Sequence, residues 1–221
     1  MVKSSMKLAI FNTFKTKGSE LTGEANRQRE IITILADSSN SAEKTRTGIS
    51  QKMAKKQGVG WKNIYSGIFR DLDEILLPMN IAQEEGRLPL KRGPKALQEI
   101  GIPYYHLTKK GILIALSISG EKNREKLLKQ FFSESEPAEK EFEKILLNLI
   151  NASPSFTYSI IQKYVKAFCE NKIQDLLPFD LSKLKEISDD SLMIQKEILS
   201  AFVKFSKQDK EKTTGFLDKI T

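Results

Sequence analysis

The segment from Pro103 to Gly111, PYYHLTKKG, changes its structural preference halfway along. Its tyrosine pair and the following His-Leu are typical of a β-strand, whereas Thr-Lys-Lys-Gly-Ile is typical of the first turn of a helix. A threonine at this place caps a helix, because its hydroxyl accepts a hydrogen bond from a backbone N–H that has no partner inside the helix. We therefore predict a strand, Ile102 to Leu107, that ends directly on a helix capped by Thr108.

The segments before this junction alternate between helical and turn-forming patterns. Apolar periodicity predicts three helices separated by turn-forming residues, and two short stretches around a long basic connection then predict two strands. The predicted elements are helices 26–37, 49–57 and 61–77, a GVG turn at 58–60, and strands 80–88 and 102–107. Residues 1–25 show little periodicity, so we predict a loosely ordered basic arm with at most one short element between Leu8 and Phe14.

Three motifs in this order resemble the winged helix-turn-helix transcriptional regulators of the PadR and MarR kind, which occur in archaea and bacteria. MAKKQGVGWKNIYSGIFRDLDEI, from Met53 to Ile75, is similar to the two helices and the turn of such domains. KRGPK (91–95) and YYHLTKKG (104–111) are similar to their wing and closing strand. The residues that match the closing segment are Tyr105, Leu107, Thr108, Lys110 and Gly111.

The resemblance covers about half of the chain, roughly residues 26–118, and marks a fold more than a function. It implies a mainly α fold with a small β wing, in which residues 26–120 form a winged helix-turn-helix DNA-binding domain. Ala96–Ile102 departs from the family pattern as an insertion between the basic tip and the strand. The wing should therefore be longer than usual.

Positive charge is concentrated in the first half of the chain. Residues 1–120 carry 19 Lys and Arg against 11 Asp and Glu, a net charge of +8, whereas residues 121–221 carry 17 of each. An asymmetry of this kind indicates nucleic acid or an anionic membrane surface as the partner of the basic half.

The helix 61–77 separates an apolar stripe from a polar face. The pattern predicts that Ile64, Ile68, Leu72 and Ile75 are buried. The opposite face carries Asn63, Ser66, Gly67 and Arg70, with Lys62 at its margin. Arginine and asparagine are the side chains that read guanine and adenine in a major groove, and glycine permits close approach. Because Asp71, Asp73 and Glu74 would be repelled by phosphates, we predict that only the first three turns enter the groove. The alternative is an ordinary amphipathic surface helix.

The remaining basic side chains are predicted to hold backbone phosphates, which gives affinity and register without sequence information. The predicted contacts are Gln51, Lys52, Lys55 and Lys56 on the second helix, and Arg87, Lys91, Arg92 and Lys95 on the wing. Lys109 and Lys110 have two open interpretations, solvated surface lysines or phosphate contacts. Trp61 is predicted to fill the gap between helices, with a deoxyribose contact as the alternative. His106 is predicted to pack or cap.

The sequence argues against an enzyme. With one histidine and one cysteine, zinc sites and His-dependent nucleophilic catalysis lack their components, and phosphate-binding glycine loops are not found. We predict no cofactor, no metal and no catalytic residue, and a buried inert thiol at Cys169. The N-terminal apolar stretch is too short for a secretory signal, and the longest apolar run is too short for a membrane span. We therefore expect a soluble, cytoplasmic protein without a membrane partner.

Residues 121–221 are predicted to form a helical bundle. Helices are expected at 142–150, from Ser155 to about Leu177, around Leu181–Ile187 and at Ser191–Phe205, with weaker periodicity in the tail. The phenylalanines to be buried are Phe131, Phe132, Phe142, Phe156, Phe168, Phe179, Phe202 and Phe205. Such a bundle suits dimerisation or partner binding, because two copies double the phosphate contacts. The alternative is a bundle that serves only its own stability.

The sequence thus favours a homodimeric regulator of transcription that binds double-stranded DNA. Two other classes stay open. The first is a winged-helix module for protein interaction and assembly in a larger nucleic-acid-handling complex. The second is an RNA-binding protein, which is disfavoured because only Tyr104 and Tyr105 offer aromatic rings near the wing.

Overall fold

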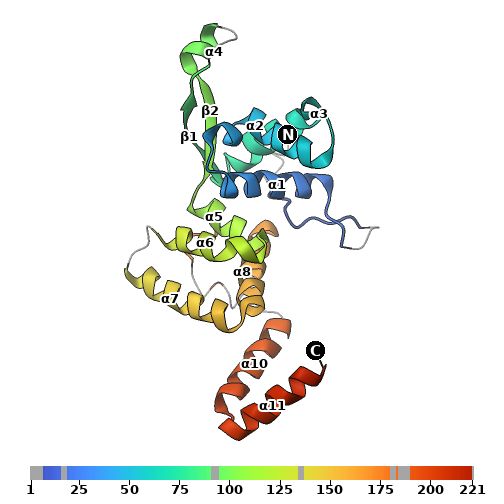
Figure 1. Ribbon diagram of the computed structural model, residues 1–221, viewed down its shortest axis with the longest axis vertical. Coiled ribbons are helices and arrows are strands. Elements are labelled where there is room, and N and C mark those ends of the chain that lie inside the picture. The colour runs from blue at the N-terminus through green and yellow to red at the C-terminus, as the bar shows by residue number, and fades with distance from the viewer. Residues whose placement is uncertain are drawn as a thin grey trace. The chain divides into compact units, whose positions relative to one another are not determined.

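A computed structural model describes residues 7–15, 19–90, 95–133, 137–179, 183 and 190–220. These residues are mainly helical and contain one two-stranded antiparallel sheet, as predicted (Figure 1). The chain forms two compact units, Met1–Pro178 and Phe179–Thr221, and each is described by itself.

The first unit contains most of the elements. They are α1 (Gly23–Asp37), the 3₁₀ turn η1 (Ser41–Lys44), α2 (Arg46–Gln57), α3 (Trp61–Arg70), the π-helical continuation η2 (Asp71–Leu76), β1 (Ala82–Leu88), α4 (Lys95–Ile100), β2 (Ile102–Leu107), α5 (Lys109–Ile118), α6 (Glu121–Phe132), α7 (Pro137–Ala152) and α8 (Pro154–Cys169). The predicted helices and strands of residues 26–118 are present. The second helix begins three residues earlier than predicted, because Thr45 caps it by accepting from Gly48 N–H.

Strands β1 and β2 form the predicted antiparallel pair, with Ala82 opposite Leu107 and Leu88 opposite Ile102. A bulge at Glu84/Gly86 interrupts the ladder. Thr45 forms an isolated antiparallel bridge with Tyr104, which ties the start of α2 to the sheet. The predicted insertion between the strands is largely the short helix α4, which lies at the far end of the hairpin from α1 (Figure 1).

The junction at Thr108 has the predicted structure. Its hydroxyl oxygen accepts from Gly111 N–H at 3.1 Å, which caps α5, and its hydroxyl donates to the Asn80 carbonyl at 2.6 Å. Gly111 is required here, since a Cβ atom would lie 2.0 Å from the carbonyl oxygen of Ile81. Helix α5 then runs through the core, with every side chain from Ile112 to Ser117 buried.

The units do not divide where the sequence predicts. A boundary at residue 120 is expected, but α5 packs on α1 and also on α6 and α8, so the helices on both sides of residue 120 share one core. The N-terminal segment differs as well. Leu8, Ala9 and Ile10 are buried, and Ala9 N–H donates to the buried Gln28 side chain at 2.8 Å, so this part of the predicted arm belongs to the core.

The helix predicted to reach about Leu177 ends at Cys169. Asn171 adopts a left-handed backbone conformation (φ 60°), which turns the chain back. The returning segment is held by the Tyr164 hydroxyl, which donates to the Leu176 carbonyl at 3.2 Å. Cys169 is buried as predicted, and burial raises the pKa of its thiol to about 12.

The second unit contains two helices, α10 (Asp190–Lys204) and α11 (Lys207–Ile220). The first corresponds to the helix predicted at 191–205, and the tail is helical despite its weak periodicity. The helix predicted around 181–187 lies outside the described residues except for Lys183. Among the helices described, none combines the length and the apolar character needed to cross a membrane.

Candidate nucleic-acid interface

The turn between α2 and α3 is built by two glycines. Gly58 ends α2 in the left-handed conformation (φ 68°), and Val59 N–H donates to the Ala54 carbonyl at 3.1 Å. Glycine adopts this left-handed conformation at the end of a helix at little steric cost, because it has no Cβ atom. Gly60 then precedes the first residue of α3, and the two helices pack on each other.

Helix α3 presents the predicted polar face. Lys62, Asn63, Ser66 and Arg70 are exposed, whereas Ile68 and Leu72 are fully buried. Ile64 and Ile75 are only half-buried, and the buried stripe continues through Leu76. The shift from Ile75 to Leu76 follows from η2, because a π-helical turn rotates the last residues relative to a regular α-helix.

Gly67 does not belong to this exposed face, so that prediction is wrong. A Cβ atom at Gly67 would lie 3.0 Å from the Nε of Arg27 on α1. The side chain of Arg27 passes over Gly67 to reach Asp71, with which it forms an ion pair. The glycine therefore makes room for the side chain of Arg27 inside the protein.

The carboxylates after α3 are already paired, which the sequence did not indicate. Asp71 is fully buried and is held by Arg27 and by Gln28. Asp73 accepts a bidentate pair of hydrogen bonds from Arg46 on α2, with the Nε–Oδ2 distance at 3.0 Å. The charges of Asp71 and Asp73 are thus compensated inside the protein. Of the three acidic residues, only Glu74 is exposed. The expected repulsion of phosphates is correspondingly smaller.

Arg46 also joins α3 to the sheet. Its guanidinium lies 5.3 Å from the ring centroid of Phe69 and 5.2 Å from that of Tyr105. Burial raises the pKa of the Tyr105 phenol to about 12, so this ring is neutral at physiological pH. The arrangement fixes the side of α3 that faces the hairpin.

The three lysines of α2 are exposed, but they differ in their partners. Lys52 donates to Glu43 at 2.6 Å and to Ser38 at 2.9 Å, and Lys56 pairs with Glu30 at 2.9 Å. The Lys52 hydrogen bond is the main cause that lowers the pKa of Glu43. Gln51 and Lys55 are exposed, and within the described part of the chain Lys55 has no ion pair. Exposed pairs are weak, so Lys52 and Lys56 remain available to a phosphate.

Of the four basic residues predicted to contact phosphates from the hairpin, the structure describes Arg87 and Lys95. Arg87 is half-exposed and pairs with Glu84 at 2.7 Å. Lys95 is exposed on α4. Lys91 and Arg92 lie outside the described residues, so their predicted phosphate contacts stay predictions.

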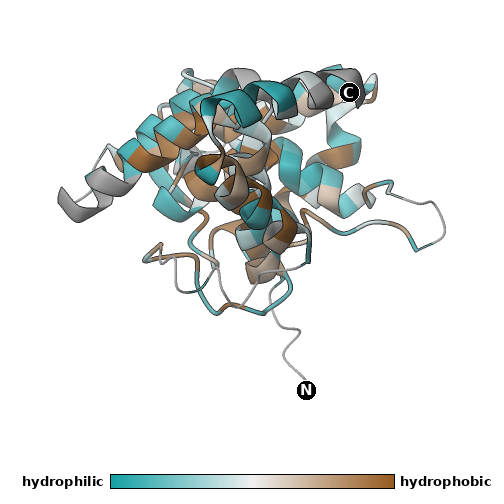
Figure 2. Cartoon of the chain, turned by 90° about the horizontal axis from the view of Figure 1, so that it is seen from below, coloured by the Kyte–Doolittle hydropathy of each residue, from teal (hydrophilic) through white to brown (hydrophobic). Residues whose placement is uncertain are grey.

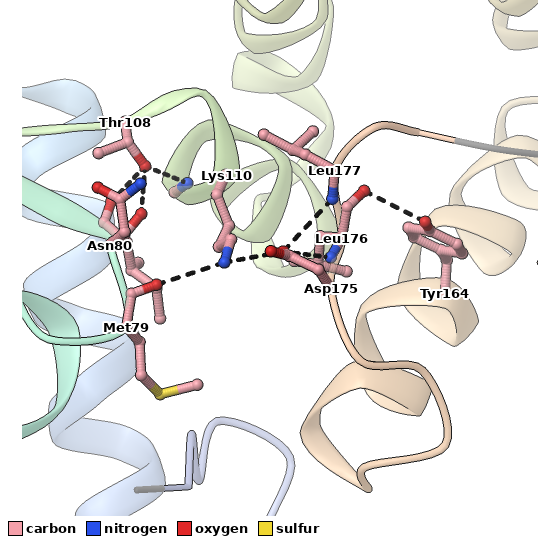
Figure 3. Close-up of polar contacts among 10 residues, drawn as sticks. Met79, Asn80, Thr108, Lys110, Tyr164, Asp175, Leu176 and Leu177 are labelled. Atoms are coloured by element: carbon pink, nitrogen blue, oxygen red, sulfur yellow. Dashed lines mark hydrogen bonds and ion pairs between the residues drawn. The ribbon is translucent and has the colours of Figure 1, made fainter.

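Lys110 is largely buried, which argues against both interpretations left open for it, a solvated surface lysine and a phosphate contact. Only 13 % of its side chain is exposed, and it donates to Asp175 at 2.8 Å and to the Met79 carbonyl at 3.5 Å (Figure 3). Asp175 thus supplies an anion to Lys110, which lies in the first turn of α5, where a cation is otherwise slightly unfavourable. Lys109 lies over the ring of Phe131 at 5.3 Å.

Two further predictions concern Trp61 at the start of α3 and His106 on β2. Trp61 is half-buried and meets Tyr65 edge-on, with ring centroids 5.8 Å apart. His106 is predicted to pack or cap, and its Nε2 lies 2.8 Å from the Gln83 amide nitrogen.

An aromatic stripe on α3 was not predicted from the sequence. Trp61, Tyr65 and Phe69 follow one another at intervals of four residues, and Phe69 is 46 % exposed. Their spacing alone indicates a shared helix face, since residues four apart lie on the same side of a helix. The stripe places apolar surface beside the polar face of α3.

In comparisons with known proteins, no family model, no curated protein and no solved structure matches this chain. Within the described residues, no three His, Cys, Asp or Glu side chains are grouped as metal ligands.

Proposed function

We propose that this chain is a cytoplasmic transcriptional regulator that binds double-stranded DNA through a winged helix-turn-helix domain. The observation that carries the proposal is the polar face of α3, on which Asn63, Ser66 and Arg70 are exposed side by side beyond a tight glycine turn. In this proposal, helix 61–77 lies in the major groove and the three side chains meet base edges.

The charge pattern around α3 supports this orientation. Lys55 on α2 and Lys62 at the start of α3 are exposed cations on the two helices that form the turn. Asp71 and Asp73 are compensated by Arg27 and Arg46, so the distal half of the helix repels phosphates less than its sequence suggests. In the proposal, the hairpin of β1 and β2 is the wing, and its basic residues contact the flanking backbone.

Binding of labelled duplexes across a salt series tests the proposal. A random sequence is compared with fragments from upstream of the protein's own gene. Arg70→Ala should lower the preference for one base pair by about 1–3 kcal/mol, because a bidentate contact to guanine is lost. Lys55→Ala should weaken every duplex alike and reduce the salt slope by about 1, because one phosphate contact is lost.

The matched control is Lys126→Ala, which removes the same charge from an exposed position on α6. It should leave duplex affinity and salt slope nearly unchanged. Equal losses from the Arg70, Lys55 and Lys126 variants would mean that duplex binding reflects net charge alone, and the assignment of α3 as reader would be abandoned.

We further propose that the regulator acts as a homodimer, since one reading helix contacts little DNA and two copies double the phosphate contacts. The residues after 120 would provide the association or a protein partner site.

A second candidate function is a protein-assembly module in a larger nucleic-acid-handling complex. It is favoured by the apolar surface beside the reading face, where Val59 is 45 % and Phe69 46 % exposed. Aromatic residues of this kind are enriched in protein interfaces. Weak binding to all duplexes at moderate salt, together with a stoichiometric protein partner on purification that is lost in Phe69→Ser, would favour this second function.

A further inference from the structure

The described residues of the unit Phe179–Thr221 include an exposed apolar helix face. None of the described side chains is buried, although α10 and α11 carry many apolar residues. Figure 2 shows hydrophobic and hydrophilic residues in turn along the helical ribbons. Short helices that bury few side chains are marginal in water, because most helical stability comes from tertiary packing.

One stripe of α10 has the spacing of a helix-pairing seam. Ile194, Ile198 and Ala201 lie on α10, and Phe205 directly follows its last residue, Lys204; the four follow at intervals of four, three and four residues, as the core positions of a coiled coil do. We call these four residues the α10 stripe. Ile194 is 55 % and Ile198 59 % exposed.

The described contact of the neighbouring helix lies beside this stripe. Lys210 of α11 lies 5.9 Å from the ring centroid of Phe202, so α11 approaches the flank of α10 that carries Phe202. The opposite flank carries Asp190, Glu197 and Lys204, spaced seven residues apart. The α10 stripe lies between the flank that Lys210 approaches and a flank of charges.

We infer that the α10 stripe pairs with the same stripe of a second copy of this chain, in antiparallel orientation. The inference rests on the homodimer of the proposed function and names its surface. A symmetric interface must be complementary to itself, so that residue i meets residue j and j meets i. The spacing of four, three and four reads the same in both directions, which satisfies this condition.

Size and charge both select the antiparallel orientation. About a two-fold axis between positions 199 and 200, Ile198 lies opposite Ala201 and Ile194 opposite Phe205 of the second copy, so that larger side chains meet smaller ones. In an antiparallel pair each flank of α10 faces the same flank of the second copy. Glu197 of each copy then lies near Lys204 of the other, so the dimer has two such charge pairs. A parallel pair would set this charged flank against the uncharged flank with Gln195 and Phe202.

The net charge permits this association. Residues 190–220 contain six Lys and five Asp or Glu, a net charge of +1, so two copies repel each other little. The excess charge of the chain lies in residues 1–120, which leaves the proposed nucleic-acid interface and the pairing surface on different parts of the molecule.

Sedimentation equilibrium of the full chain without DNA tests the inference. The unaltered protein should be a dimer, and Ile198→Glu should raise the dimer dissociation constant at least about 100-fold, because each copy would bury an uncompensated charge in the seam. Val203→Glu is the matched control. Val203 is 76 % exposed on the same helix but off the stripe, so this variant should remain a dimer.

Charge exchange tests the orientation. Glu197→Lys and Lys204→Glu should each weaken the dimer about threefold to tenfold, and the double variant should restore it. A monomeric unaltered protein, a dimer that survives Ile198→Glu, or equal dissociation by Val203→Glu would overturn the inference. Additive losses in the charge variants would overturn the antiparallel register. Because no DNA is present, these outcomes are independent of duplex binding, which is measured separately with Arg70→Ala.

Discussion

The two units use similar amphipathic helices with different results. In Met1–Pro178, the apolar side chains of α1, α5, α6 and α8 meet in a core where Ile31, Ile114 and Val165 are fully buried. In Phe179–Thr221, no described side chain is buried. An amphipathic pattern therefore fixes a helix and its apolar face, whereas burial requires enough neighbouring helices to cover that face.

Substitution of two glycines, one in each unit, should change stability in opposite directions. Gly111→Ala should destabilise the first unit by about 3 kcal/mol, because the new Cβ atom would lie 2.0 Å from the Ile81 carbonyl oxygen and backbone would have to move. Gly215→Ala in α11 should instead stabilise its helix by about 0.5–1 kcal/mol, since nothing lies within 4 Å of its Cβ position. Urea unfolding followed by circular dichroism measures both. Similar small effects would show that the packing around α5 is looser than described.

The second effect concerns the buried ion pair beneath α3. Asp71→Asn should cost about 3 kcal/mol, because Arg27 would keep its charge in a largely buried place without a carboxylate. Asp73→Asn is the matched control on the same π-helical turn, where both partners are about a fifth exposed or more, and it should cost less. Thermal unfolding compares the two variants. A larger loss from Asp73→Asn would reverse the assignment of the main ion pair.

The smallest effect concerns the ion pair near the end of the first unit. Burial by itself would raise the pKa of Asp175, but hydrogen bonds from Lys110 and from two backbone N–H groups lower it below its usual value. A lowered pKa in the folded state stabilises the protein above the unfolded pKa, about 3.9, and this contribution is lost as pH falls further.

Asp175→Asn should therefore reduce stability at pH 7 by less than about 1 kcal/mol, since the carboxylate is half-exposed. The difference from the unaltered protein should begin to shrink below about pH 4, where Asp175 is protonated in the unfolded state, and should disappear only below the lower pKa of the folded state. Urea midpoints at both pH values measure this. A difference that grows on acidification would contradict the sign of the shift.

Much of the first unit follows from local pattern. Periodicity predicts α1, α2 and the helix through Leu76, alternation predicts both strands, and the Thr108 cap is as expected. The exposure of Asn63, Ser66 and Arg70 also follows, because a helix with a strong apolar stripe must turn its polar side outward. These features depend on residues within a few positions of one another.

Other features depend on partners far away along the chain. Arg27 meets Asp71 across 44 residues, and this contact both fills the space over Gly67 and compensates a predicted repulsive charge. Lys110 pairs with Asp175 in the turn after α8, so Lys110 does not contribute to the proposed interface. No periodic pattern specifies such pairs.

The order of helices and strands, the capped junction at Thr108 and the polar face of α3 could be predicted before folding, because they rest on short-range periodicity and capping chemistry. Which charges are neutralised, that Leu8–Ile10 enters the core, and that the first unit extends to Pro178 became clear from the folded chain. Burial and ion pairing depend on which faces meet in space, and distant segments of one chain determine that together.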